Sequence, residues 1–114
     1  MPPEASTSRT VRTLDRPDGV RVVTVVGAVD VFNAGVLTRD AVAGLPDASR
    51  EIVLDLEGVS FLDSGGISAI VKLVRQLRSQ SIEMRASIGR DSTLSPTMVE
   101  LLRQVVPFDD ADAR

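Results

Sequence analysis

The pattern of hydrophobic and polar positions is clearest in the middle of the chain, where an apolar run is followed by a helical repeat. Residues 52–56 read Ile-Val-Leu-Asp-Leu, which suits a strand packed on at least one face. From Ile67 onward, apolar side chains recur at spacings of three and four residues, and basic residues take the opposite side. The apolar positions of this repeat are Ile67, Ile70, Val71, Val74 and Leu77. The pattern predicts a strand that leads directly into an amphipathic helix.

Shorter patterns on either side of this unit predict further strands and helices. Residues 10–14 and 20–26 flank the turn sequence Arg-Pro-Asp-Gly, so they predict an N-terminal hairpin. Residues 82–88 alternate between apolar and polar side chains, which is typical of a strand with one face toward the core. Helices are predicted over about residues 33–44 and from Ser95, a good N-cap, onward. Their predicted inward positions are Val36, Leu37, Val42, Met98, Leu101, Leu102 and Val105.

The predicted order of elements is β-β-α-β-α-β-α, which indicates the α/β class. We expect one domain with a mixed β-sheet of about four strands, layered with about three to four α-helices. A chain of 114 residues, 43% of them hydrophobic, is long enough to bury one core and too short for two ordinary domains. Residues 1–8 have the composition of a disordered N-terminal tail, and residues 107–114 form a frayed acidic C-terminal tail. The predicted domain is therefore 9–106.

The composition excludes several classes of function. A net charge of −3 gives no basic footprint for nucleic acid, and three phenylalanines are the only aromatic residues available for base stacking. Cysteine and histidine are both absent, so we expect no disulfide, no metal site and no cofactor. The sequence has no signal-peptide pattern and no apolar run of about 18 residues. We therefore expect a cytoplasmic protein that neither binds nucleic acid directly nor inserts into a membrane.

The candidate chemistry lies in residues 63–66, Asp-Ser-Gly-Gly, where a hydroxyl stands at the start of the central helix. Asp63 is a natural N-cap, and Ser64 falls in the first turn, where free N–H groups and the helix dipole favour negative charge. The chain has no histidine or cysteine to activate Ser64 as a nucleophile. Lys72 lies roughly 12 Å further along the helix, too far to take its proton. We predict that Ser64 is modified by another protein and that this chain is not an enzyme.

Two blocks of the sequence resemble the STAS domains, and among them the bacterial anti-sigma factor antagonists. Residues 53–66 are similar to the strand of that family that ends in Asp-Ser-Ser/Thr-Gly before the second helix. Residues 27–30, Gly-Ala-Val-Asp, look like its earlier Gly-x-hydrophobic-Asp segment. The blocks have the order and spacing of the family, and the resemblance extends over about residues 10–106. One position departs from the pattern, because Gly65 stands where the family usually has Ser or Thr.

The resemblance implies a STAS-type single domain that works by partner switching. The unphosphorylated protein would bind an anti-sigma factor with serine kinase activity and so release a sigma factor. Phosphorylation of Ser64 by that kinase would dissociate the complex, and a phosphoserine phosphatase would reset it. An alternative function within the family is that of a non-catalytic STAS subunit of a membrane transport ATPase complex for lipids. The partner-binding residues implied are Asp30, Asn33, Asp63, Ser64, Gly65 and Gly66.

Each of these residues also has a purely structural explanation. Asp63 and Ser64 suit an ordinary helix cap, and Asp30 suits a turn or cap before the first helix. Asn33 is predicted to cap that helix. The glycines at 65–66 ordinarily indicate poor helix propensity, but beside a modifiable serine they would also let the backbone of another protein approach closely. If Asp30 and Ser64 do share one surface, the Ser64 hydroxyl should be solvent-accessible and should lie close to Asp30.

Overall fold

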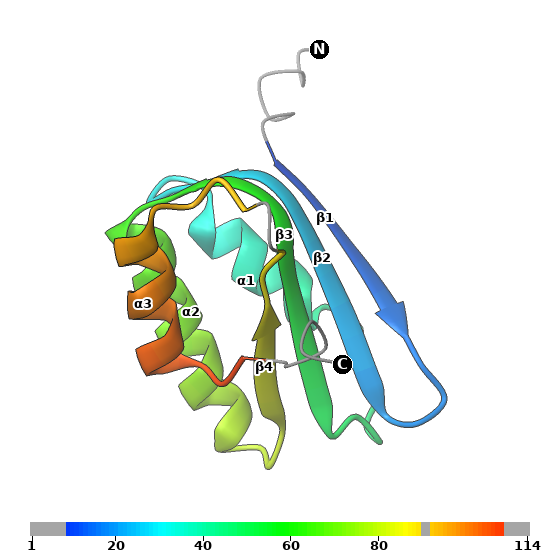
Figure 1. Ribbon diagram of the computed structural model, residues 1–114. Helices are drawn as coiled ribbons and strands as arrows, with labels where there is room; N and C mark the ends of the chain where they lie inside the picture. The colour runs from blue at the N-terminus through cyan, green and yellow to red at the C-terminus, as the bar shows by residue number, and fades with distance from the viewer. Residues whose placement is uncertain (1–8, 90–91, 109–114) are drawn as a thin grey trace.

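Four strands form one sheet in the order β1-β2-β3-β4 in the computed structural model (Figure 1), which describes residues 9–89 and 92–108. β1 pairs antiparallel with β2, whereas β2, β3 and β4 run parallel. Along the described chain the elements follow the predicted β-β-α-β-α-β-α order of a mixed α/β domain. The strands are β1 (Arg9–Asp15), β2 (Val20–Val29), β3 (Glu51–Leu62) and β4 (Glu83–Ser87), and the helices are α1 (Ala34–Val42), α2 (Ser64–Arg78) and α3 (Pro96–Val105).

The core lies between the sheet and the helices, as the hydrophobic pattern predicted. Alternate side chains of β3 are buried for most of its length. In α2, Ile70, Val74 and Leu77 of the predicted face are buried, Ile67 and Val71 are only partly buried, and Leu73 is buried in addition. Because side chains alternate along a strand and recur every three to four residues along a helix, each element supplies one row to the core. Figure 1 shows α2 between α1 and α3 beside the sheet. The central members of the core are Ile52, Leu54, Leu56, Ile70, Leu73, Val74 and Leu77.

The two flanking helices differ in detail from the prediction. In α1 the buried side chains are Ala34, Leu37 and Ala41, whereas Val36 and Val42 are only partly buried. The three buried positions are spaced by three and four residues, so two small alanines occupy the face toward the core. The prediction that α3 turns Leu101 inward is wrong, because that side chain is 38% exposed. Its neighbour Leu102, which was also predicted to face inward, is fully buried.

A bulge in β3, opposite the end of β2, places the next segment of the chain. Gly27 has a φ of 103°, a conformation that favours glycine, and the pairing with β3 shifts register between Gly27 and Ala28. With this bulge β2 continues to Val29, beyond the predicted end at residue 26, and Val29 pairs with Leu62 at the end of β3. The carboxyl ends of both strands therefore meet at one edge of the sheet.

The chain returns to the sheet after α3. The backbone N–H of Ala86 in β4 donates to the carbonyl of Pro107 at 2.8 Å, and Phe108 forms an isolated parallel bridge with Ala86. The guanidinium of Arg103 lies 4.4 Å from the centre of the Phe108 ring. Pro107 and Phe108, which the sequence assigns to the acidic tail, thus contact the domain. The rest of that tail, 109–114, and the N-terminal tail, 1–8, lie outside the described residues.

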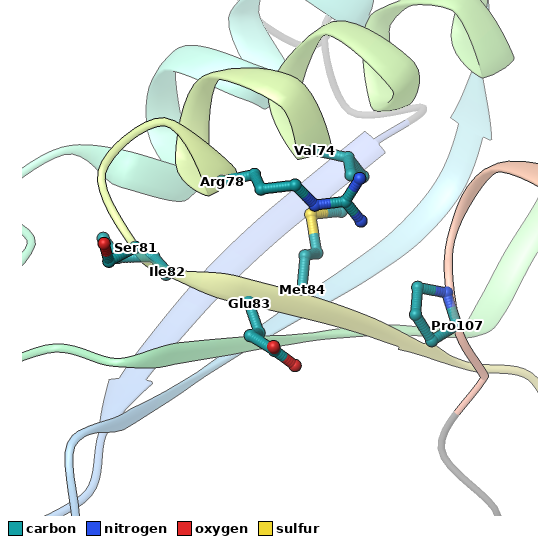
Figure 2. Close-up of a pocket in the computed structure, with 7 residues that line it drawn as sticks. All are labelled: Val74, Arg78, Ser81, Ile82, Glu83, Met84 and Pro107. Atoms are coloured by element: carbon teal, nitrogen blue, oxygen red, sulfur yellow. The ribbon is translucent and has the colours of Figure 1, made fainter.

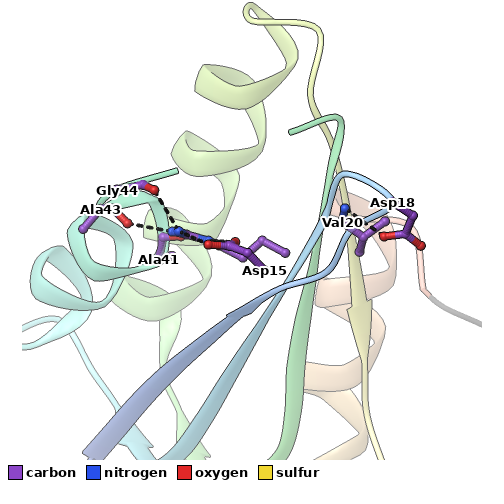
Figure 3. Close-up of polar contacts among 7 residues, drawn as sticks. Asp15, Asp18, Val20, Ala41, Ala43 and Gly44 are labelled. Atoms are coloured by element: carbon purple, nitrogen blue, oxygen red, sulfur yellow. Dashed lines mark hydrogen bonds and ion pairs between the residues drawn. The ribbon is translucent and has the colours of Figure 1, made fainter. Parts of the chain in front are cut away.

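Arg21 is the only charged residue that is buried in the part of the chain that the structure describes, with 3% of its surface exposed. Figure 3 shows Asp15 of the hairpin facing Ala41, Ala43 and Gly44 at the end of α1, and these four residues accept hydrogen bonds from the guanidinium. Nε and Nη2 donate to the Asp15 carboxylate at 2.6 and 2.9 Å. Nη1 donates to the carbonyls of Ala41 and Ala43 at 3.1 and 2.8 Å, and Nη2 also donates to that of Gly44 at 3.2 Å. These five bonds equal the full donor capacity of an arginine.

Candidate functional site

Ser64 opens α2 directly after β3 ends at Leu62, as the sequence predicted. Asp63 between them is the N-cap, and its Oδ1 accepts a hydrogen bond from the backbone N–H of Gly66 at 2.9 Å. The Ser64 side chain is exposed. A hydroxyl in the first turn of a helix faces free N–H groups and the positive end of the dipole, so a phosphate there is compatible with the helix.

The segment between β2 and α1 lies against this turn. The backbone N–H of Asp63 donates to the carbonyl of Val29 at 3.3 Å, and the N–H of Val31 donates to Asp63 Oδ2 at 3.4 Å. In the sequence Asp30 lies between Val29 and Val31, the two residues bonded to Asp63. The two sequence blocks that resembled one family are therefore brought together, and the exposed Ser64 directly follows the residue that joins them.

Asp30 and Asn33 close the loop before α1 through reciprocal hydrogen bonds. Asp30 Oδ1 accepts from the N–H groups of Phe32 and Asn33 at 2.9 and 3.0 Å. Asn33 Oδ1 accepts from the N–H of Asp30 at 3.0 Å, and its Nδ2 donates to the carbonyl of Ala28 at 3.0 Å. Asn33 does occupy the N-cap position, but its side chain makes no capping bond. The predicted side-chain cap is wrong because the Asn33 amide reaches back to β2 instead.

The two glycines after Ser64 serve the packing of the protein itself. A Cβ added to Gly65 would lie 2.6 Å from Cβ and 2.8 Å from Cα of Val31. A Cβ added to Gly66 would lie 2.5 Å from Leu62 Cδ1 and 3.1 Å from a methyl of Val29. Gly66 is buried, so its missing side chain leaves room for the core rather than for another protein. Gly65, the departure from the family pattern, leaves room for Val31, a contact that sequence reasoning missed.

Gly65→Ser would supply the missing hydroxyl, and we expect it to lower the free energy of unfolding by about 1–3 kcal/mol. The new Cβ would overlap the backbone of Val31, which cannot rotate away as a side-chain tip can. Urea unfolding measures the difference. Gly35→Ala in α1 is the matched control, because a Cβ there meets nothing within 4 Å and alanine favours the helix by about 0.5–1 kcal/mol. Equal stability of Gly65→Ser and the wild type would contradict the close packing of Val31 on Gly65.

The opposite end of α2 carries a separate depression of about 390 Å³, shown in Figure 2. Arg78 extends over Met84 there, and the Glu83 carboxylate points away from both. The depression thus gathers no acid–base pair, and it lies at the far end of the helix from Ser64. Within residues 9–89 and 92–108, no group of three or more His, Cys, Asp or Glu side chains is placed to hold a metal ion. None of the described helices is both long and apolar enough to cross a membrane.

Comparison with known proteins places the chain in a family. The model of the STAS domain family matches residues 12–90, more than half of the chain. The chain therefore belongs to the STAS domain family, and the predicted STAS-type fold is confirmed. Over 72 residues it is 29% identical to BtrV of Bordetella bronchiseptica, which is named as a candidate anti-sigma factor antagonist. That match covers 63% of this chain and 62% of the length of BtrV.

Solved structures show the same architecture. A crystal structure of an anti-sigma factor antagonist from Mycobacterium paratuberculosis is similar with a TM-score of 0.61 and 26% identity, over 88% of this chain and 96% of that one. The Bacillus cell fate determinant SpoIIAA, in its phosphorylated form, is similar with a TM-score of 0.63 and 16% identity, over 91% and 95% of the two chains. At 16% identity, the similarity to SpoIIAA shows a shared fold alone.

Proposed function

We propose that this protein is an anti-sigma factor antagonist that binds an anti-sigma factor while Ser64 is unphosphorylated, and thereby releases a sigma factor. The observation that carries the proposal is the exposed Ser64 hydroxyl at the start of α2, next to the loop that contains Asp30. Two of the similar proteins are named as anti-sigma factor antagonists, one of them as a candidate. We also infer a cytoplasmic location, because transcription takes place there.

Phosphorylation of Ser64 would switch the interaction off. A phosphoserine brings about −1.5 to −2 charges at neutral pH. Asp63 stands directly before it, and Asp30 lies in the loop bonded to Asp63. A partner surface that fits a neutral hydroxyl beside two carboxylates would meet added repulsion and a desolvation cost. The phosphate would leave the helix intact, since the N-terminal end of α2 tolerates negative charge. SpoIIAA, which shares this fold, has been solved in a phosphorylated form.

The chemistry of phosphorylation belongs to the partner. The γ-phosphoryl group of ATP bound to the anti-sigma factor kinase would pass to Ser64 Oγ, leaving ADP, and a base of the kinase would take the hydroxyl proton. This chain offers no histidine or cysteine for that task. A separate phosphoserine phosphatase would hydrolyse the ester and restore the binding form. We therefore assign to this chain the role of substrate and binding partner, without catalysis of its own.

A phosphotransfer assay tests the proposed function. Incubation with the cognate anti-sigma factor and ATP is expected to add one phosphate per chain, at Ser64, as measured by intact mass and peptide mapping. Ser64→Ala should accept none. Ser79→Ala is the matched control, because Ser79 is an exposed serine at the far end of α2 from Ser64, and this variant should still be phosphorylated. Phosphate on another residue, or on none, would contradict the assignment of Ser64.

A further inference from the structure

Two apolar side chains project from the loop between β2 and α1. Val31 is 61% exposed and Phe32 is 92% exposed. The loop that carries them is held by hydrogen bonds from the N–H of Phe32 to Asp30 and from the N–H of Val31 to Asp63. Phe32 thus presents an apolar ring to solvent from a fixed backbone. A large aromatic ring displayed in this way costs little ordering entropy when a partner covers it.

A groove of about 430 Å³ between α1 and α2 begins at the same loop. Val31 and Gly65 line one end of it, and Lys72 lines the wall further along α2. Small residues of the two helices keep it open, among them Gly35 and Ala69. A Cβ added to Gly35 would meet nothing within 4 Å, so the space beside α1 there is empty. The groove can therefore receive a side chain without any rearrangement of the fold.

One row of exposed side chains on α2 joins this groove to the phosphorylation site. Ser64, Ser68 and Lys72 are spaced by four residues, which places them on the same stripe of the helix. Ser68 and Lys72 line the groove. Lys72 forms no ion pair with any residue that the structure describes. The stripe therefore runs from the modifiable hydroxyl to an exposed cation available to a partner.

We propose that Phe32 and this groove form the apolar part of the surface that binds the anti-sigma factor, an inference that rests on the proposed function. Phe32 enters an apolar pocket of the anti-sigma factor. An apolar side chain of the anti-sigma factor enters the groove, and one of its carboxylates pairs with Lys72. The contact between Val31 and Gly65 makes this surface continuous with the turn that carries Ser64. A protein seated on it would therefore also cover Ser64, where a phosphate would repel it.

Calorimetric titration of the cognate anti-sigma factor into single variants tests this surface. Phe32→Ala is expected to weaken binding at least about 30-fold, the loss typical of a buried aromatic anchor. Leu14→Ala is its control, because Leu14 is 64% exposed on β1 and does not line the groove. Gly35→Gln, which fills the groove, should weaken binding at least about tenfold, whereas Arg39→Gln, an exposed position of α1 outside the groove, should bind within a few-fold of the wild type. Thermal unfolding of each variant shows whether it is folded.

The outcomes separate this inference from the proposed function. If the wild type binds and its phosphorylated form does not, while folded Phe32→Ala and Gly35→Gln bind like the wild type, the surface is wrong and the function stands. If the unmodified wild type binds no anti-sigma factor, both the proposed surface and the proposed function are wrong. Size-exclusion chromatography adds a further check: a dimer that becomes a monomer on Phe32→Ala would assign the surface to a second copy of this chain and overturn the inference.

Discussion

Phosphorylation of Ser64 is expected to weaken binding of the anti-sigma factor by about 5- to 150-fold, the range given by a coupling of roughly 1–3 kcal/mol. The phosphate adds charge next to Asp63, which is fixed in place by its hydrogen bonds with Gly66 and Val31. Neither carboxylate oxygen can therefore turn away from the phosphate without losing one of these bonds. Calorimetry on the phosphorylated and unmodified protein measures the two affinities.

Two variants of Ser64 separate the effect of charge from that of the hydroxyl. Ser64→Ala keeps a small neutral surface, so it should bind like the wild type and resist inactivation by the kinase and ATP. Ser64→Asp carries less charge than a phosphate and is shorter, so it should show only part of the loss. If phosphorylated and unmodified protein bound equally well, the modification could shift no equilibrium and the switch would have to be abandoned. Membership of the STAS family would be unaffected.

Asp63 is a poor residue for testing the switch, because it has two tasks. As the N-cap of α2 it accepts from Gly66, and its removal would cost about 0.5–2 kcal/mol of stability. It also accepts from Val31 and so fixes the adjoining loop. Asp63→Ala would therefore disturb the fold of the surface together with its charge. Ser64 makes neither of these bonds, which is why its variants report on binding alone.

The order of elements and the turn at Ser64 could be predicted because both depend on local sequence. The apolar run along residues 52–56 predicts a packed strand, and the repeat from Ile67 predicts a helix with one buried face. The caps at Asp63 and Ser95 are also local, and their side chains accept from the backbone N–H groups of Gly66 and Met98. Helix and strand periods describe one element at a time, so these features need no knowledge of what packs against them.

Several features that could not be predicted involve residues far apart in the chain. Val31 packs on Gly65, a pairing set by the register shift opposite Gly27 and Ala28 and by the parallel alignment of β2 with β3. The exposure of Phe32 could not be predicted, because one apolar side chain in a loop carries no periodic signal. The burial of Arg21 in β2 could not be predicted either, because a charged side chain usually lies at the surface. That burial depends on where the last carbonyls of α1 lie, and no local pattern reports that.

Arg21→Met is expected to destabilise the protein by about 2–4 kcal/mol, which corresponds to a fall in Tm of roughly 10–25 °C. Methionine keeps the apolar stem but removes all five hydrogen bonds, including those to the carbonyls at the end of α1. The Ala41 carbonyl is in a buried bond and would lose its Arg21 donor without gaining water. Arg12→Met is the matched control on β1, where the side chain is exposed, and should change stability by less than about 0.5 kcal/mol.

The pH dependence of unfolding distinguishes the ion pair from simple packing. Hydrogen bonds from Arg21 lower the pKa of the Asp15 carboxyl below its usual value. A carboxyl with a lowered folded-state pKa stabilises the protein above its unfolded pKa, and that contribution is lost as the pH falls through the folded value. The stability of the wild type should therefore fall more steeply in this acid range than that of Arg21→Met. Arg21→Lys keeps the charge but not the planar fork, so its loss of stability in acid should be intermediate in steepness between those of the wild type and Arg21→Met. An ammonium cannot bond to Asp15 and three carbonyls together.

Equal stability of Arg21→Met and Arg12→Met would show that the buried guanidinium does not hold α1 to the hairpin.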